Sequence, residues 1–261
     1  MKIVVCIKQV PDTTEVRLDP KTGTLIRDGV PSIINPDDKS GLEAAIRIKE
    51  KVGGEITVLT MGPLQAENAL REALAMGADR GILLTDRAFA GADTWATSQT
   101  LAAAIRKLDF DLIIAGRQAI DGDTAQVGPQ IAEHLKLTQV SYVEDLKLEG
   151  HKLLVKRIFE DSFQWIRVST PCLITTLKEM NEPRYMSVGG VFDAFREKEI
   201  IRWNLGDIEV DLANIGLKGS PTKVKKSFTK GVKGKGEIFQ DLSPNEAAKL
   251  IAERLREKFI I

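Results

Sequence analysis

The chain has 261 residues, with 37 Lys and Arg, 37 Asp and Glu, two His and two Cys, so its formal net charge is zero. This length suits one large domain, or one domain with an extension, and it can bury a full core without disulfides. Zero net charge argues against a general nucleic-acid-binding protein, and the few Cys and His argue against a disulfide scaffold or a metal site. No apolar run reaches the roughly 18 residues of a membrane span, and the charge at Lys8 comes too early for a signal peptide. We therefore expect a cytoplasmic protein.

Buried strands and helices alternate over residues 1–135. Short apolar runs rich in branched residues are typical of strands buried on both faces, and they occur at Ile3–Ile7, Ile56–Met61, Gly81–Thr85 and Phe110–Ala115. Helical patterns follow over 42–51, 65–76 and 93–107, and a fourth helix is expected to end near Leu135. A hairpin with Pro20 and Gly23 in its turn is expected over Val16–Arg27. Such alternation predicts right-handed crossovers, and hence an α/β fold with a doubly wound, mostly parallel sheet and helices on both faces.

The pattern changes after Thr138. Apolar and polar residues alternate over 140–149, 152–159 and 164–168, as in half-exposed antiparallel strands, and a buried strand returns at Pro171–Thr176. Residues 218–236 hold seven lysines among Gly, Ser and Thr, a composition that favours a solvated or partner-bound arm. Ser243, Pro244 and Glu246 form a capping box for a final helix. We expect an α/β domain over 1–190, with antiparallel strands at 138–170, and a C-terminal extension over 191–261.

Ligands of doubly wound sheets bind at the carboxyl ends of the strands, where the strand order reverses. The loop Gly116–Thr124 has two glycines and leads into a helix, and Asp93–Ser98 starts another helix with three hydroxyls, so both could bind phosphate. Equally, these residues could serve only as helix caps and turn formers. The usual glycine-rich dinucleotide and P-loop motifs are absent. The residues alone thus favour a nucleotide-binding α/β protein.

No side chain is expected to act as an acid, base or nucleophile. His134 and His151 are expected at the surface, away from the predicted site, and Cys6 lies in an apolar run with nothing to lower its pKa. Any redox chemistry would therefore belong to a bound cofactor.

Several motifs resemble one known family over nearly the whole chain. They are VVCIKQVPD at the start, INPDD at 34–38, ALAMGADRG at 73–81, GRQAIDGD at 116–123, NEPRY at 181–185 and the stretch Val155–Thr175. Together they resemble the beta subunit of electron transfer flavoprotein. In that stretch, Ser162 stands where the family usually has Gly, Asp or Glu.

The resemblance implies a fold, a partner and a cofactor site. The fold would be Rossmann-like, similar to the adenine nucleotide alpha hydrolases, and the chain would form a heterodimer with an FAD-containing alpha subunit, wrapped by the C-terminal extension. Carried over by position, the nucleotide site comprises Cys6, Asn35, Pro36, Asp37, Asp38, Met61, Gly116, Arg117, Gln118, Ala119, Ile120, Asp121, Gly122, Asp123, Thr124, Ala125, Gln126 and Val127. The predicted strands end at Cys6–Lys8, Thr60–Pro63, Thr85 onward and Gly116–Thr124, and three of these four strand ends contribute to the set.

The family has two branches, which differ in the nucleotide held by the beta subunit. In the housekeeping branch the nucleotide is a structural AMP; in the electron-bifurcating branch it is a second FAD, reduced by NADH. The segments at 120–130 and 91–102 resemble the bifurcating branch, where Thr94 and Thr97 would add hydrogen bonds and Gly122 would give room for a pyrophosphate. One electron would then pass to ferredoxin or flavodoxin and the other, through the alpha-subunit FAD, to an acyl-CoA dehydrogenase. Arg117 could stabilise the reduced flavin by its charge.

The segment after NEPRY corresponds to the loop by which the family docks onto acyl-CoA dehydrogenases. Val188, Val191 and Phe192 are expected to form that contact, because apolar residues on a polar loop suggest a partner surface; internal packing is the alternative. A non-bifurcating subunit with AMP is the main alternative function. An ATP-binding stress-type α/β protein and nucleic-acid binding through the lysine-rich arm are more distant ones.

Overall fold

The structure is a computed structural model that describes residues 1–12, 31–150, 152–225, 234 and 236–261. It divides into two compact units, Met1–Lys226 and Ser227–Ile261. The hairpin expected at Val16–Arg27, His151 and part of the lysine-rich arm lie outside the described residues. Among the helices of the described ranges, none combines the length and apolar character needed to cross a bilayer.

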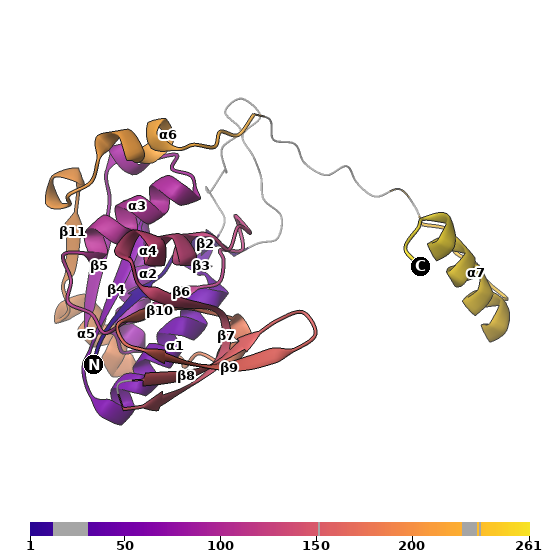
Figure 1. The fold of residues 1–261 in the computed structure, drawn as a ribbon, viewed down its shortest axis with the longest axis horizontal. Helices are drawn as coiled ribbons and strands as arrows, with labels where there is room; N and C mark the ends of the chain where they lie inside the picture. Colours follow the sequence, from indigo (N-terminus) through magenta and orange to yellow (C-terminus); the bar gives the residue numbers. More distant parts are fainter. Residues whose placement is uncertain (13–30, 151, 226–233, 235) are drawn as a thin grey trace. The chain divides into compact units, whose positions relative to one another are not determined.

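Within the described residues, nine strands form one sheet in the order β11-β5-β4-β1-β6-β10-β7-β8-β9 (Figure 1). Every neighbouring pair from β11 to β7 is parallel. The bounds of these seven strands are β1 Lys2–Cys6, β4 Glu55–Met61, β5 Arg80–Leu84, β6 Leu112–Gly116, β7 Thr138–Glu149, β10 Cys172–Thr176 and β11 Ile200–Trp203. The chain builds outward from β1 through β4 and β5, and then returns to the other side of β1 as β6. The strand order therefore reverses between β1 and β6, and the expected doubly wound α/β fold is confirmed.

Helices cover both faces of this sheet. One core cluster joins the sheet to α1 (Pro36–Val52), α2 (Glu67–Met76) and α5 (Val188–Arg196), and the other joins it to α3 (Thr94–Ile105) and α4 (Val127–Leu135). Figure 1 shows α3 and α4 on one side of the strands and α1 on the other. Helix α1 begins at Pro36, six residues before the periodic pattern suggested. Proline fits the first helical turn, and Asp37 and Asp38 suit the positive end of the helix dipole.

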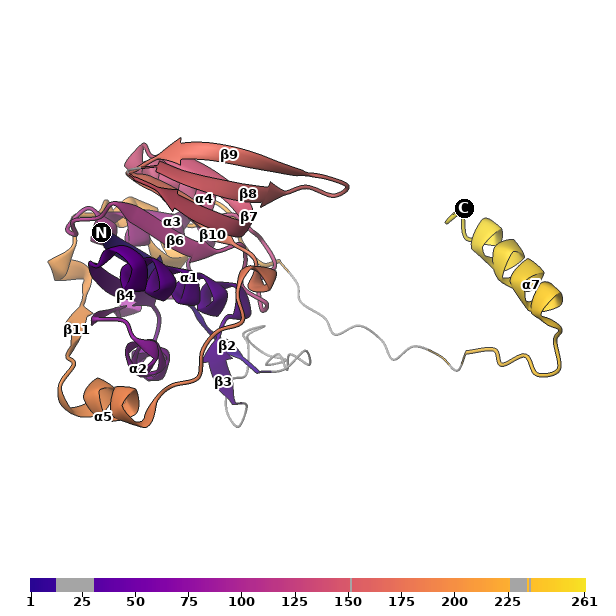
Figure 2. The ribbon, with the colours of Figure 1, turned by 90° about the horizontal axis from the view of Figure 1, so that it is seen from below.

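The strands after Thr138 differ from the expectation in one respect. Strand β7 pairs antiparallel with β8 (Lys152–Ile158), which pairs antiparallel with β9 (Phe163–Ser169), as predicted. The other edge of β7, however, pairs in parallel with β10. Strand β7 is thus the strand that joins the two kinds of pairing, and the antiparallel hairpin extends the main sheet at one end (Figure 2).

Residues after 190 contribute more to the first unit than the sequence suggested. Ala194 of α5 is fully buried, β11 pairs with β5 at the sheet edge, and the short helix α6 (Gly216–Gly219) contacts α3. The first compact unit therefore extends to Lys226, rather than to the boundary expected at 190, because these residues complete the sheet and its core. A small separate sheet pairs β2 (Gln9–Pro11) with β3 (Ser32–Ile34).

The second unit contains helix α7 (Pro244–Glu257). Ser243 accepts a hydrogen bond from the Glu246 backbone, and the Glu246 carboxylate accepts one from Ser243 in return, so the predicted capping box is present. Its apolar residues include Ile251, which is exposed within this chain. That the extension contacts an alpha subunit remains a prediction.

Candidate functional site

A cavity of about 1160 Å³ lies at the carboxyl ends of β1, β4, β5 and β6, where the strand order reverses. Drug-sized ligands occupy pockets of roughly 300–1,000 Å³, so this cavity has room for a larger molecule. The predicted site residues that line it are Cys6, Asp38, Met61, Thr94, Thr97, Gly116, Arg117, Gln118, Ala119, Gly122, Thr124, Ala125, Gln126 and Val127. They come from β1, α1, β4, α3 and the loop between β6 and α4, which is the location expected at the switch point of such a sheet.

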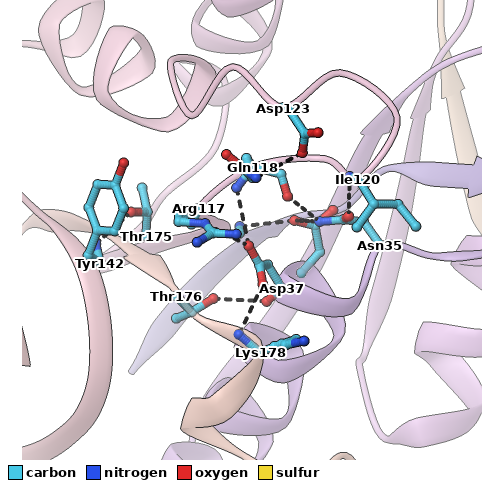
Figure 3. A network of polar contacts seen from close by, with 12 residues as sticks. Asn35, Asp37, Arg117, Gln118, Ile120, Asp123, Tyr142, Thr175, Thr176 and Lys178 are labelled. Atoms are coloured by element: carbon cyan, nitrogen blue, oxygen red, sulfur yellow. Dashed lines mark hydrogen bonds and ion pairs between the residues drawn. The ribbon is translucent and has the colours of Figure 1, made fainter. Parts of the chain in front are cut away.

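The other predicted site residues, Asn35, Pro36, Asp37, Ile120, Asp121 and Asp123, are not part of the cavity wall. Asn35 is fully buried beneath the loop that follows β6 (Figure 3). Its amide nitrogen donates to the Gln118 carbonyl at 2.8 Å, and its amide oxygen accepts from the Ile120 N–H at 3.0 Å. Asn35 therefore holds the loop from below rather than facing the ligand.

Asp37 ties the same loop to the end of β10 (Figure 3). One carboxylate oxygen accepts from the Lys178 N–H at 3.0 Å, and the other lies 3.4 Å from Nε of Arg117 in an ion pair. Burial raises the pKa of Asp37, while the Arg117 charge opposes that rise. The loop has two further supports: the Gln118 amide donates to Asp123 at 2.8 Å, and Lys8 pairs with Asp121 at 2.6 Å.

Asp38 links β1 to the start of the loop. Its carboxylate accepts hydrogen bonds from the Lys8 N–H at 2.7 Å, the Gly116 N–H at 3.0 Å and the Asn35 amide at 3.0 Å. A Cβ atom on Gly116 would lie 2.0 Å from Oδ1 of Asp38, so glycine alone permits this approach. The carboxylate therefore locks together the two strand ends that flank the switch point.

Helix α3 supplies a second wall. Asp93 caps it by accepting from the Ala96 N–H at 3.0 Å, and Thr94 and Thr97 line the cavity. The Thr94 hydroxyl donates to the Gln126 amide oxygen at 2.8 Å, which connects this wall to the loop before α4. Ser98, the third hydroxyl of this helix start, does not line the cavity: it is buried and donates to the Trp95 carbonyl.

Two other residues can be compared with their expected roles. His134 is half-buried rather than at the surface, because its Nε2 contacts the Ser98 hydroxyl at 3.0 Å and its ring meets the edge of Trp95. Burial and the nearby Arg106 lower its pKa. Cys6 lines the cavity, where burial, with a smaller contribution from Asp38, raises the pKa of its thiol to about 12. A neutral thiol is a poor nucleophile, which agrees with the prediction that nothing in the sequence around Cys6 lowers its pKa.

Sequence reasoning missed part of the wall. The segment after β5 contributes Asp86, Phe89 and Gly91, and the distant Thr222 and Val224 also line the cavity. The position of Thr85 at a strand end was the only available signal for the first group. Nothing in the sequence pointed to Thr222, because its contact joins residues more than a hundred positions apart.

We expect Asp38 to make stability depend on pH. Burial raises its pKa from 3.8 to about 7, although the three hydrogen bonds oppose the rise. Between those values the native state holds a proton that the unfolded chain has released, so the free energy of unfolding falls as pH rises. At its steepest the change approaches about 1.4 kcal/mol per pH unit. Asp38→Asn should remove this slope in urea unfolding of the nucleotide-free protein, whereas replacing the exposed Asp145 by Asn should keep it. An unchanged slope in Asp38→Asn would contradict the assignment.

The architecture and the cavity at its switch point define a doubly wound α/β protein of the kind that binds nucleotides. A family model described as the electron transfer flavoprotein domain matches residues 22–208. The chain belongs to the electron transfer flavoprotein family, and the relatives that it matches over its whole length include beta subunits.

Three relatives illustrate this. The chain is 60% identical to an electron transfer flavoprotein subunit beta of Clostridium acetobutylicum, with 100% of both chains covered. It is 58% identical to the caffeyl-CoA reductase-Etf complex subunit CarD of Acetobacterium woodii, and 46% identical to the acryloyl-CoA reductase electron transfer subunit gamma of Anaerotignum propionicum, again with 100% of both chains covered. The family resemblance predicted from the motifs is confirmed, and it decides against a stress-type ATP-binding protein.

Proposed function

We propose that this chain is the beta subunit of an electron-bifurcating electron transfer flavoprotein, that its cavity holds FAD, and that NADH is the electron donor. The observation that carries the proposal is the extent of the cavity. It continues from the loop 116–127 past Thr94 and Thr97 to the segment after β5, so its wall offers more surface than one mononucleotide would cover. The names of two relatives, which place them with CoA-ester reductases, agree with the proposal.

The residues present fit a flavin dinucleotide. A Cβ atom on Gly122 would meet no other atom within 4 Å, so the loop leaves open space at that point. Thr94 and Thr97 line the cavity at the start of α3, where the positive end of the helix dipole favours a phosphate. Buried apolar residues such as Phe89 and Leu101 form the inner wall and would keep water from a flavin ring.

A bound FAD would supply the redox chemistry: it would take a hydride from NADH, pass one electron to ferredoxin or flavodoxin, and pass the other through the FAD of an alpha subunit to an acyl-CoA dehydrogenase. The chain itself would bind and orient the cofactor and adjust its electrostatic surroundings. Asn35, Asp37 and Asp38 would hold the backbone of the loop 116–127 in place around the cofactor, since they bond to Gln118, Ile120 and Gly116.

The test is to co-express this chain with its alpha subunit, extract the complex with acid, and count FAD and AMP per heterodimer. We expect two FAD and no AMP, and bleaching of flavin absorbance by NADH. One FAD and one AMP would instead make this chain a structural nucleotide-binding subunit. Gly122→Glu should lower the FAD count, because it adds a negative charge to the cavity, whereas Gly122→Ala should retain FAD.

Arg117 is expected to raise the reduction potential of the bound flavin. A cation at the cavity wall favours the gain of electrons, although the ion pair with Asp37 offsets part of its charge. Arg117→Gln should therefore shift the potential to a more negative value, and Arg117→Lys should largely preserve it. Spectroelectrochemical titration measures both, and identical potentials in all three proteins would contradict this role.

Helix α5 is expected to dock onto the acyl-CoA dehydrogenase. Val188 is 90% exposed and Phe192 53% exposed, while Ala194 on the opposite side is buried. Arg71 of α2 holds the helix in place by donating to the Ala194 carbonyl and to the Lys198 carbonyl. The apolar side chains are thus presented on an anchored helix, as expected for a partner surface.

Val188→Glu should raise the KM for the dehydrogenase about thirtyfold, since interface hot spots are worth about 2 kcal/mol or more and each 1.4 kcal/mol is tenfold. The rate of dye reduction by NADH should stay unchanged, because Val188 is not part of the cavity wall. The matched control is Val52→Glu, which alters a half-exposed valine at the end of α1. Equal KM values in the two variants would rule out docking through Val188.

A further inference from the structure

One part of the cavity wall comes from a segment far away in the sequence. We call Ser220–Val224 the strap; Thr222 and Val224 of the strap line the cavity. Val224 is nonetheless 84% exposed, which places it at the mouth rather than in the depth of the cavity. The strap is thus a boundary between the cavity and solvent.

The strap is fastened to the start of α3 by Asp93. Oδ2 of Asp93 accepts from the Thr222 hydroxyl at 2.8 Å and from the Thr222 N–H at 3.0 Å. Asp93 also acts as a donor to the strap: its backbone N–H donates to the Ser220 hydroxyl at 2.8 Å. Oδ1 of the same carboxylate caps α3, so one side chain holds both the strap and the helix that carries Thr94 and Thr97.

The chain just before the strap packs closely on the segment after β5. Leu217 N–H donates to the Ala90 carbonyl at 3.0 Å, and the Ser220 hydroxyl donates to the Gly216 carbonyl at 2.8 Å. A Cβ atom on Gly216 would lie 2.0 Å from the Ala88 carbonyl oxygen, which shows how closely the backbones approach. Ser220 is buried, but Thr222 and Lys223 beyond it are exposed. The anchored part therefore ends at Ser220. Among the hydrogen bonds of the described residues, only the two between Asp93 and Thr222 hold the rest of the strap.

We infer that the strap closes the mouth of the cofactor cavity and that the Asp93–Thr222 contact controls how fast the bound dinucleotide leaves. The inference rests on the proposed function, because it assigns the strap to the same FAD cavity. The strap has to move for a ligand of that length to pass, while the loop 116–127 and the start of α3 stay in place. Asp93 and Thr222 are therefore positioning residues: they act on the rate of exchange and take no part in electron transfer.

The test uses the complete heterodimer and follows the release of nucleotide after dilution, by the rise in flavin fluorescence and by the nucleotide content of the filtrate. In Thr222→Val we expect one release phase to accelerate at least about tenfold, which corresponds to the lower end, about 1.5 kcal/mol, of the contribution of a hydrogen bond to a charged group. Thr222→Ser keeps the hydroxyl and should restore the slow rate. Asp93→Asn should lie between the two, because its amide oxygen can still accept a hydrogen bond.

The matched control is Asp211→Ala. Asp211 accepts from the Ala213 N–H in the same C-terminal part of the first unit, but it is not part of the cavity wall. This variant should release nucleotide at the wild-type rate. Thr222→Val and Asp211→Ala each remove hydrogen bonding to a carboxylate, so both should lower the melting temperature of the nucleotide-free complex by similar amounts. Only Thr222→Val should release nucleotide faster, which a merely structural effect would not explain.

Release rates of Thr222→Val and wild type that agree within twofold would overturn the inference. The proposed function fails separately, if the wild-type complex yields AMP in place of the second FAD. In that case the comparison of release rates still decides whether the strap retains the nucleotide.

Discussion

Gly116→Ala is expected to empty the nucleotide cavity and to lower the free energy of unfolding by about 1–3 kcal/mol, the usual cost of overpacking. The new methyl group would lie 2.0 Å from Oδ1 and 2.8 Å from the backbone nitrogen of Asp38. Asp38 cannot move aside without losing its hydrogen bonds to the Lys8 and Gly116 N–H groups. The end of β6 and the loop behind it would therefore separate from β1, and the backbone that surrounds the ligand would lose its shape.

Gly122→Ala is the matched comparison, since a Cβ atom there meets nothing within 4 Å. Both variants add one methyl group to the same loop, so a difference between them reports the Asp38 contact rather than the loss of a glycine. Urea unfolding and the nucleotide content of the purified heterodimer measure the two effects. Equal stability and equal nucleotide content in the two variants would show that Asp38 does not lock the loop.

Asn35→Ala is expected to destabilise the protein by about 2–5 kcal/mol and to release the nucleotide. The substitution leaves the Gln118 carbonyl and the Ile120 N–H without their partner beneath the loop. Both bonds are only partly buried, so each unpaired group should cost toward the lower end of about 1–3 kcal/mol. The Asp38 carboxylate would also lose one of its three donors. The loop would become mobile, so we expect a larger loss of nucleotide affinity than of stability.

Asn35→Asp separates hydrogen bonding from side-chain volume. It keeps the acceptor for Ile120 but removes the donor to Gln118, and it adds a carboxyl group beside Asp38. We expect this variant to regain stability as the pH falls, since protonation removes the repulsion between the two carboxylates. Asn214→Ala, which removes one side-chain hydrogen bond to Asp211, should cost less than about 1.5 kcal/mol. Equal losses of unfolding free energy in Asn35→Ala and Asn214→Ala would show that the hydrogen bonds of Asn35 stabilise the protein no more than an ordinary side-chain hydrogen bond does.

The order of strands and helices up to Leu135 could be predicted from the sequence because buried parallel strands and amphipathic helices have different periodicities. Helix starts were harder to place. The apolar pattern of α1 begins at Leu42, but the helix begins at Pro36, so the three polar residues that organise the loop lie at its start. The sequence likewise favoured a C-terminal extension over 191–261, whereas β11 pairs with β5 of the main sheet and Ala194 is buried in the core of the first unit.

The sequence by itself determined the fold class, the family and the strand ends where a ligand can bind, because these depend on local periodicity and on motifs that are continuous in the chain. Only the tertiary structure decided which residues face the cavity and which support it. Asn35 and Asp37 lie beneath the loop, while Thr222 reaches the cavity from 129 positions beyond Asp93. The residue type limits which hydrogen bonds a side chain can make, but the packing of distant segments determines which partner lies within reach of that side chain. The roles proposed for Asn35, Asp93 and Thr222 therefore follow from contacts of the folded chain.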